Sequence, residues 1–166
     1  MLGGLEWFGK KIGPDPSSID ACMIGGIVAN NSSGMCCGVL QNTYHTLKSM
    51  RIIFSDGTLL DTSYESSRAQ FEKTHGAMLE GLRKLSIEVR SDQQLYEKIV
   101  RKYKIKNTTG YSLNALVDFE DPFEILQHLI VGSEGTLAFV GMYLSITISI
   151  SISITVSIAV HLFGTL

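Results

Sequence analysis

The chain of 166 residues lacks the residues on which several common functions depend. With 14 basic and 16 acidic side chains its net charge is −2, so the overall balance does not indicate nucleic-acid binding. The three cysteines, Cys22, Cys36 and Cys37, form no C-x-x-C pair and no zinc or iron–sulfur ligand spacing. No basic start with a long apolar run follows Met1, so no signal peptide is predicted. We therefore expect reduced thiols, an intracellular, cytoplasmic location, no metal site and one domain with its own core.

Positive charge is also missing from the stretch Gly13–Gly38, which contains no Lys or Arg and is rich in Gly, Ser, Asn and Pro. A second glycine-punctuated turn follows at Val131–Thr136. Neither turn contains a P-loop or a G-x-G-x-x-G fingerprint. The first stretch suits an uncharged cradle for a polar ligand such as a pyrophosphate, and an ordinary turn-rich loop is the alternative.

The opening of the chain mixes short elements with turns. Residues Met1–Lys11 could form a short helix or turn, which the glycine and prolines from Gly13 onward would end. Strands are expected over Leu47–Phe54 and Leu59–Thr62, because Asp-Gly between two apolar runs is typical of a β-hairpin.

Helical periodicity follows between Tyr64 and Lys104, with a break and cap at Ser91-Asp92. The expected apolar faces comprise Met78, Leu82, Leu85 and Val89 in one segment and Leu95, Ile99 and Tyr103 in the next. The basic side chains near the end of this region favour a solvated helix end over a phosphate-binding patch; they are Lys98, Arg101, Lys102, Lys104 and Lys106.

Past a polar turn at Asn107–Tyr111, a helix is expected from Asp121-Pro122 through Ile130, and a strand over Leu137–Leu144. The tail from Gly141 to Leu166 then carries no charged side chain and alternates Ile with Ser or Thr. It suits a strand, a membrane-crossing segment or low-complexity sequence added by an artefact, and these alternatives stay open.

Single catalytic residues are weakly indicated. Glu134 lies between glycines, where a structural role is more common than acid catalysis. His45 is a candidate acid or base with no visible partner, and a structural role is favoured. Ser32 and Ser33 have no nucleophile elbow around them, so a hydrolase is not indicated.

Three motifs together resemble one protein family. They are I-G-P-D-P-S-S from Ile12, I-G-G-I-V-A-N-N-S-S-G from Ile24 and V-G-S-E-G-T-L from Val131. In this order, with a D-G-T hairpin and N-T-T-G-Y between them, they resemble the PCMH-type FAD-binding domain of FAD-linked oxidases of the vanillyl-alcohol-oxidase type. The resemblance is greatest to the D-lactate and D-2-hydroxyglutarate dehydrogenase branch, including long bacterial-type proteins that carry an iron–sulfur region.

The resemblance implies an α+β fold, mainly the second subdomain of that domain, with a hairpin, inserted helices and a closing strand. It implies FAD as cofactor, held largely by the backbone, and a small 2-hydroxy acid as substrate. The implied cofactor-binding residues are Pro14, Asp15 and Ser17 in the first loop, Gly25 and Gly26 near the pyrophosphate, Asn30, Asn31, Ser32 and Gly34 toward the flavin, Gly135 and Val140 toward the adenine, and Glu134 orienting its turn.

The resemblance extends over residues 1–142, and residues 143–166 lie outside it. The family's first subdomain, with its own pyrophosphate loop, and its substrate domain with the expected acid/base residues have no counterpart here. We therefore expect an internal portion of a flavoprotein that binds FAD weakly or not at all by itself and has no turnover. A membrane-attached or interaction module without catalysis is the alternative, and it depends on the uncharged tail.

Overall fold

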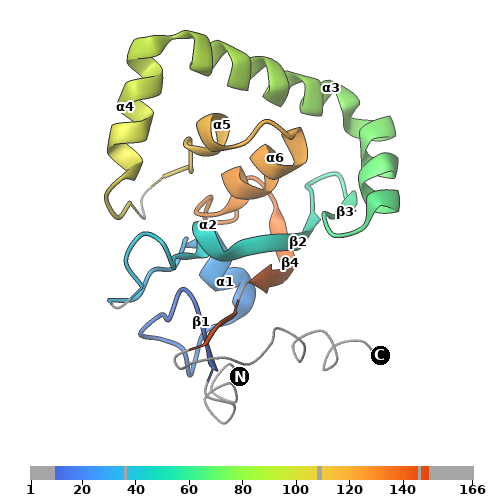
Figure 1. Cartoon of the computed structure of the whole chain (residues 1–166). Helices are drawn as coiled ribbons and strands as arrows, with labels where there is room; N and C mark the ends of the chain where they lie inside the picture. The colour runs from blue at the N-terminus through green and yellow to red at the C-terminus, as the bar shows by residue number, and fades with distance from the viewer. Residues whose placement is uncertain (1–9, 36, 108–109, 146, 150–166) are drawn as a thin grey trace.

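The computed structural model describes residues 10–35, 37–107, 110–145 and 147–149. These residues form an α+β fold in which a small antiparallel sheet is covered on one side by α3, α5 and α6 (Figure 1). The predicted α+β class is confirmed.

The sheet has the strand order β3-β2-β4, formed by β2 (Leu47–Ile53), β3 (Leu59–Asp61) and β4 (Phe139–Ser145). Ile52 of the central strand β2 pairs with Leu60 on one side and with Val140 on the other. The strand predictions are confirmed, with ends shifted by one or two residues.

The hairpin between β2 and β3 turns at Asp56-Gly57, as predicted. Gly57 has φ +85°, which a residue without a Cβ adopts freely, and Phe54 N donates to Thr58 O at 2.9 Å. The Asp56 carboxylate accepts from Thr58 N at 2.9 Å and thereby stabilises the turn.

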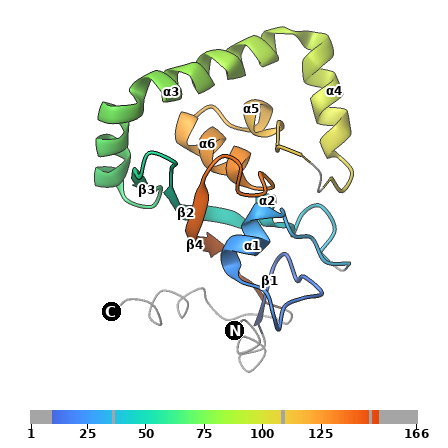
Figure 2. The same ribbon diagram turned by 180° about the vertical axis from the view of Figure 1, so that it is seen from behind.

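Two short helices lie beside this sheet, α1 (Ile24–Ala29) and α2 (Thr43–Thr46). Figure 2 shows α1 next to β4, and the two elements are in contact. α2 leads directly into β2, so the residues just before the sheet lie in one helical turn.

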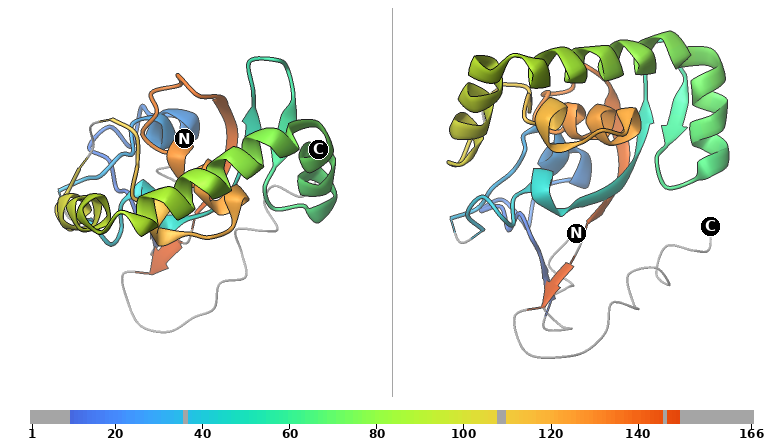
Figure 3. Two further views of the ribbon diagram at one scale, coloured as in Figure 1. Left: turned by 90° about the horizontal axis from the view of Figure 1, so that it is seen from above. Right: turned by 45° about the horizontal axis from the view of Figure 1, so that its top comes forward.

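The long helix α3 (Glu65–Ser91) crosses over α6 when the molecule is seen from above (Figure 3). The helix is interrupted at His75, whose φ of −122° and ψ of 20° are not helical. α4 (Gln93–Tyr103) follows after Asp92, whose carboxylate accepts from Leu95 N at 3.0 Å. The predicted break and cap are confirmed.

The predicted apolar faces of these helices need a correction. Val89 and Ile99 of the predicted faces are buried, and Met78 and Leu82 are partly buried against the core. Leu85 and Leu95, also predicted to be buried, are 43% and 39% exposed, whereas Leu79, outside the predicted face, is buried. α3 contacts α4, α5, α6 and β3, and its buried residues Leu79 and Ser86 lie beside the predicted stripe and not on it.

Two further helices complete the covering layer, α5 (Ala115–Asp118) and α6 (Pro122–Ile130). Asp121 caps α6, its Oδ1 accepting from Phe123 N at 3.1 Å, and Pro122 occupies the first turn. The predicted start of this helix is confirmed. The main core lies between the sheet and these helices, and it includes Ile52, Leu60, Phe71, Ile130 and Val140.

The two ends of the described chain pair with each other. β1 (Lys10–Ile12) and β5 (Thr147–Ser149) form a two-stranded antiparallel sheet with Ile12 opposite Thr147. Lys10 and Lys11 are therefore in a strand and not in the predicted helix or turn, because this pairing partner lies far away in the sequence. Residues 1–9 lie outside the described ranges.

The structure describes only part of the tail, so it tests the alternatives for the tail only there. β4 continues to Ser145, beyond the expected boundary at residue 142, and β5 follows. Residue 146 and residues 150–166 lie outside the described ranges. Within the part that the structure describes, no helix has the length and apolar character needed to cross a membrane.

Candidate functional site

The two glycine-rich turns of the sequence lie against each other. The carbonyl oxygens of Val28 and Ala29, at the end of α1, accept from Gly132 N and Glu134 N, both at 3.0 Å. Gly132 has φ +83°, and a Cβ there would lie 3.2 Å from Cβ of Asn31. Segments far apart in the sequence thus form one hydrogen-bonded unit.

The first loop is held against the end of the first glycine-rich stretch. Pro14 is fully buried, and its carbonyl oxygen accepts from Gly34 N at 2.7 Å. A Cβ on Gly34 would lie 1.9 Å from the carbonyl oxygen of Asp15, so only glycine fits there. Asp15 has φ +40°, and Ser17 is exposed in the next turn. Gly34 therefore has an internal packing role, besides any contact with a ligand.

The two glycines of α1 have different surroundings. A Cβ on Gly25 would lie 2.8 Å from the carbonyl oxygen of Val140, so Gly25 allows α1 to approach β4. Gly26 is exposed, and nothing lies within 4 Å of its Cβ position. The resemblance implied that both glycines make room for a cofactor. The structure gives Gly25 a partner within the chain and leaves the side of Gly26 open. Val140 itself is buried in the sheet.

Of the polar residues after α1, some are hydrogen-bonded within the chain and one is exposed to solvent. Asn31 is buried with φ +46°, and its side-chain oxygen accepts from Tyr44 N at 3.2 Å. Ser32 O accepts from Thr43 Oγ1 at 3.0 Å. Asn30, in contrast, is exposed at the end of α1. Asn31 and Ser32 therefore connect α1 to α2, and Asn30 faces solvent.

The second turn places its backbone at the surface. Glu134 and Gly135 are exposed, with φ +53° and +75°, and nothing lies within 4 Å of the Cβ position of Gly135. Ser133 is buried, and its Oγ has no hydrogen-bond partner among the described residues. Glu134 contributes to this turn through its backbone N–H, which donates to Ala29 O at 3.0 Å.

This surface has the properties of a main-chain ligand cradle. Gly26 and Gly135 expose backbone without side chains, and Asn30 adds an exposed amide. The two segments, residues 13–38 and 131–137, contain no Lys or Arg. Such a surface fits a polar group held by amides and hydroxyls, as a pyrophosphate can be.

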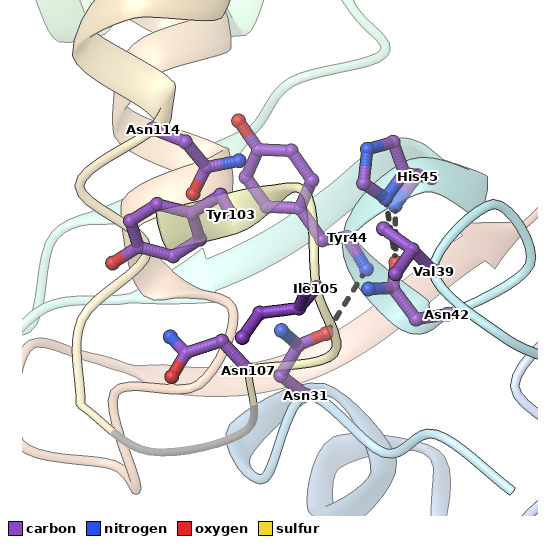
Figure 4. Close-up of a pocket in the computed structure, with 9 residues that line it drawn as sticks. All are labelled: Asn31, Val39, Asn42, Tyr44, His45, Tyr103, Ile105, Asn107 and Asn114. Carbon is purple, nitrogen blue, oxygen red and sulfur yellow. Dashed lines mark hydrogen bonds between the residues drawn. The ribbon is translucent and has the colours of Figure 1, made fainter. Parts of the chain in front are cut away.

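A small pocket adjoins Asn31, and its volume of about 10 Å³ leaves room for about one water molecule (Figure 4). It is lined by residues from α2, the segment before it, and the connection from α4 to α5: Asn31, Val39, Asn42, Tyr44, His45, Tyr103, Ile105, Asn107 and Asn114.

The polar side chains of this pocket are largely hydrogen-bonded to one another. Asn42 Oδ1 accepts from His45 N and from His45 Nδ1, both at 2.9 Å. Asp118 Oδ2 accepts from Tyr44 OH at 2.8 Å and from Asn114 Nδ2 at 2.9 Å. Asn114 Oδ1 is buried without a partner among the described residues.

Burial favours the neutral forms of the titratable side chains that line this pocket. It raises the pKa of the Tyr44 phenol, with Asp118 adding to the effect. It lowers the pKa of His45, against the opposing effect of Asp118. Behind the pocket, burial lowers the pKa of His128 to about 4; its ring stacks on Phe119 with centroids 4.0 Å apart. The pocket therefore has an uncharged, hydrogen-bonding lining near neutral pH.

The catalytic candidates from the sequence are not assembled into a reaction centre. His45 has Asn42 as a partner, which the sequence did not reveal, and its pairing is with an amide and not with a carboxylate. Ser33 Oγ lies 3.0 Å from Cys37 Sγ, and Cys37 and Cys22 are free thiols. Among the described residues, no group of three or more His, Cys, Asp or Glu could hold a metal ion.

Sequence reasoning missed Asn42, Tyr44, Asn114 and Asp118 as parts of a pocket. A weak signal exists, because Asn114 and Asp118 are four residues apart and so share a helix face. No spacing indicates that Tyr44, from α2, meets this face.

Comparison with known proteins identifies the first of the two segments. The family model of an FAD binding domain matches residues 5–63, which include α1, α2 and the hairpin. No curated protein matches the chain, and no solved structure matches it. The match does not extend to the second turn at Val131–Thr136. The cofactor that the match indicates is FAD, and the match is compatible with a flavin-dependent oxidoreductase.

Proposed function

We propose that this chain is the FAD-binding portion of a flavin-dependent oxidoreductase that oxidises a small D-2-hydroxy acid, of the D-lactate or D-2-hydroxyglutarate type. The main support for the proposal is that the two glycine-rich turns are hydrogen-bonded to each other through Gly132 N and Glu134 N. The first of these turns lies within the residues that match the family model. A bound FAD supplies flavin N5 as acceptor of the hydride from the substrate carbon that bears the hydroxyl.

In this proposal the chain's own residues bind and orient the cofactor. The exposed backbone at Gly26 and Gly135 would lie toward the cofactor, and a Cβ at either position has no atom of the described residues within 4 Å. Gly25 and Gly34 act indirectly, since each holds a loop in place by packing on backbone. No residue for removing the substrate's hydroxyl proton is assigned here.

The proposal divides the chain into an FAD-binding portion, residues 1–142, and a tail, residues 143–166. Other parts of a complete flavoprotein would supply a further pyrophosphate loop and the substrate contacts. We therefore expect weak FAD binding and no turnover by this chain alone. The uncharged cradle supports this expectation, because a few amides and hydroxyls without a cation give limited affinity for a pyrophosphate.

The cofactor part is tested by titrating the chain with FAD and following the quenching of flavin fluorescence. The variant Gly26→Leu should weaken binding at least about tenfold, because the added side chain occupies the open side of α1. Gly81→Leu is the matched control, since Gly81 is also a helical glycine with nothing within 4 Å, but lies in α3. Equal FAD affinities for the two variants would refute the placement of FAD on α1.

The substrate part is tested on the chain extended by its flanking coding sequence and loaded with FAD. D-lactate and D-2-hydroxyglutarate are supplied under anaerobic conditions, with the L-enantiomers as controls, and bleaching of the flavin spectrum is recorded. We expect bleaching by a D-acid only. Bleaching by neither D-acid would refute the substrate class, and bleaching of the unextended chain would refute its predicted inactivity.

A further inference from the structure

The connection between α4 and α5 contacts both glycine-rich turns. Lys106 Nζ donates to Ser33 O at 2.5 Å, within the first of them, Gly13–Gly38. Ser112 Oγ donates to Val131 O at 2.8 Å, at the start of the second, and this bond is buried. The described residues of this connection therefore join the two segments that the proposed function places at the cofactor.

Lys106 differs in this respect from the other basic side chains nearby. Among the described residues, no hydrogen bond joins those four to either glycine-rich turn; they are Lys98, Arg101, Lys102 and Lys104. Three of them belong to α4, and Lys104 lies at its C-terminal end. Lys106 lies beyond the helix and is exposed, but its ammonium group is bound to the first turn. The interpretation as a solvated helix end therefore does not cover Lys106, which has a specific partner.

The two turns need a cation from elsewhere in the chain if they are to hold an anionic group. They contain three carboxylates, those of Asp15, Asp20 and Glu134, and no Lys or Arg. Like charges repel at close range, so these carboxylates weaken the binding of a phosphate by backbone amides alone. The positive charge of Lys106 opposes this effect at Ser33, inside the first turn.

The ammonium group of Lys106 is held in place by a single acceptor. An ammonium group has three N–H donors, and Ser33 O accepts one of them. The neighbours Ile105 and Asn107 line the small pocket beside Asn31, which places this part of the connection next to the residue that follows α1 and its C-cap (Figure 4). An ammonium group acts on a phosphate as a point charge, so it needs no second fixed donor to attract one.

We propose that Lys106 binds the phosphate groups of the ligand that the two glycine-rich turns hold. In this role the fold supplies the cation that both turns lack, from a position 73 residues after Ser33. Two sources present such groups: the pyrophosphate of FAD, and free pyrophosphate. Only the FAD source rests on the proposed function. Because Lys106 is exposed, water and salt screen its charge, and the binding of FAD by this chain stays weak.

The test separates the charge of Lys106 from its hydrogen bond. Lys106→Gln removes the charge and keeps an N–H donor for Ser33 O, whereas Lys106→Arg keeps both. Lys104→Gln is the matched control, since it removes a basic charge two residues away. The full chain and each variant are titrated with inorganic pyrophosphate, with FAD and with riboflavin, which carries no phosphate. Phosphorus NMR and flavin fluorescence are the readouts, and thermal unfolding verifies that each variant is folded.

Lys106→Gln should weaken the binding of pyrophosphate and FAD about threefold or more at low salt, and Lys106→Arg should restore it. Riboflavin affinity should not change, and the loss for pyrophosphate should shrink as the salt concentration rises, because salt screens an exposed charge. Equal losses of pyrophosphate affinity in Lys106→Gln and Lys104→Gln would overturn the proposal, since the effect would then come from net charge alone. Unchanged pyrophosphate affinity in Lys106→Gln, or an equal loss for riboflavin, would overturn it as well.

The outcomes separate this inference from the proposed function. If FAD binds the unchanged chain and Lys106→Gln equally well, the role of Lys106 fails and the FAD function stands. If pyrophosphate binds in a manner that depends on Lys106 while FAD does not bind, the FAD function fails and the role of Lys106 stands. If neither pyrophosphate nor FAD binds, both proposals fail.

Discussion

The adjacent glycines of α1 should respond in opposite ways to alanine. A Cβ at Gly25 would lie 2.8 Å from the carbonyl oxygen of Val140, which belongs to a strand paired with β2 and cannot easily move. Relieving such an overlap costs about 1–3 kcal/mol of unfolding free energy. Gly26 has nothing within 4 Å, so alanine there should stabilise the helix by about 0.5–1 kcal/mol.

Thermal unfolding followed by circular dichroism measures this contrast. For a chain of this size about 1 kcal/mol corresponds to roughly 2–4 °C in Tm, so Gly25→Ala should lower the Tm by about 2–12 °C. Gly26→Ala should raise it by about 1–4 °C. A loss of stability in Gly26→Ala as large as in Gly25→Ala would refute the packing of α1 on β4. The same Gly26→Ala variant should bind FAD less tightly while being more stable.

Three further predictions concern other contacts. Arg90→Lys should lower the unfolding free energy, measured by chemical denaturation, by about 1–3 kcal/mol, because the guanidinium donates to three backbone carbonyls of the α5 region. The control Arg83→Lys changes an exposed ion pair with Glu80 and should lower it by less than about 0.5 kcal/mol. Equal losses for the two variants would contradict this prediction. Gly132→Ala combines φ +83° with a Cβ contact of 3.2 Å, so it should lower the Tm more than Gly135→Ala, which has φ +75° in open space. Burial lowers the pKa of His128 from 6.5 to about 4, so the unfolded chain binds more protons in this interval. The unfolding free energy should then fall by up to about 3 kcal/mol as the pH drops from about 6.5 to 4, and an equally steep fall in His128→Gln would contradict it.

The elements that the sequence predicted well depend on local chemistry. Asp56-Gly57 makes a tight turn from its own two residues, and Asp92 and Asp121 cap helices through their own side chains. These interactions join residues two or three positions apart, so a single sequence contains all the information they need. Their accuracy does not depend on how the rest of the chain folds.

The predictions that were wrong or incomplete concern residues whose structure depends on partners far away in the sequence. Lys10–Ile12 is a strand because Thr147–Ser149 lies beside it, which no local pattern indicates. Leu85 is exposed although its spacing places it with the buried Val89, because helical spacing alone does not tell which of two adjacent faces of α3 contacts the rest of the fold. The pocket around Tyr44 was missed for the same reason, since Tyr44 and Asp118 meet only through the tertiary fold.

The glycine-rich motif of the candidate site also contains features that the sequence predicts and features that depend on the tertiary fold. A run of glycines next to polar residues predicted that backbone must come close to something, and this is correct at Gly25 and Gly34. The sequence does not tell whether the approaching group is the protein or a ligand. At Gly25 and Gly34 it is a carbonyl group of the chain itself, whereas at Gly26 the space is open. The positions with open space are therefore the ones where a substitution reports on the cofactor, and the closely packed ones report on the fold.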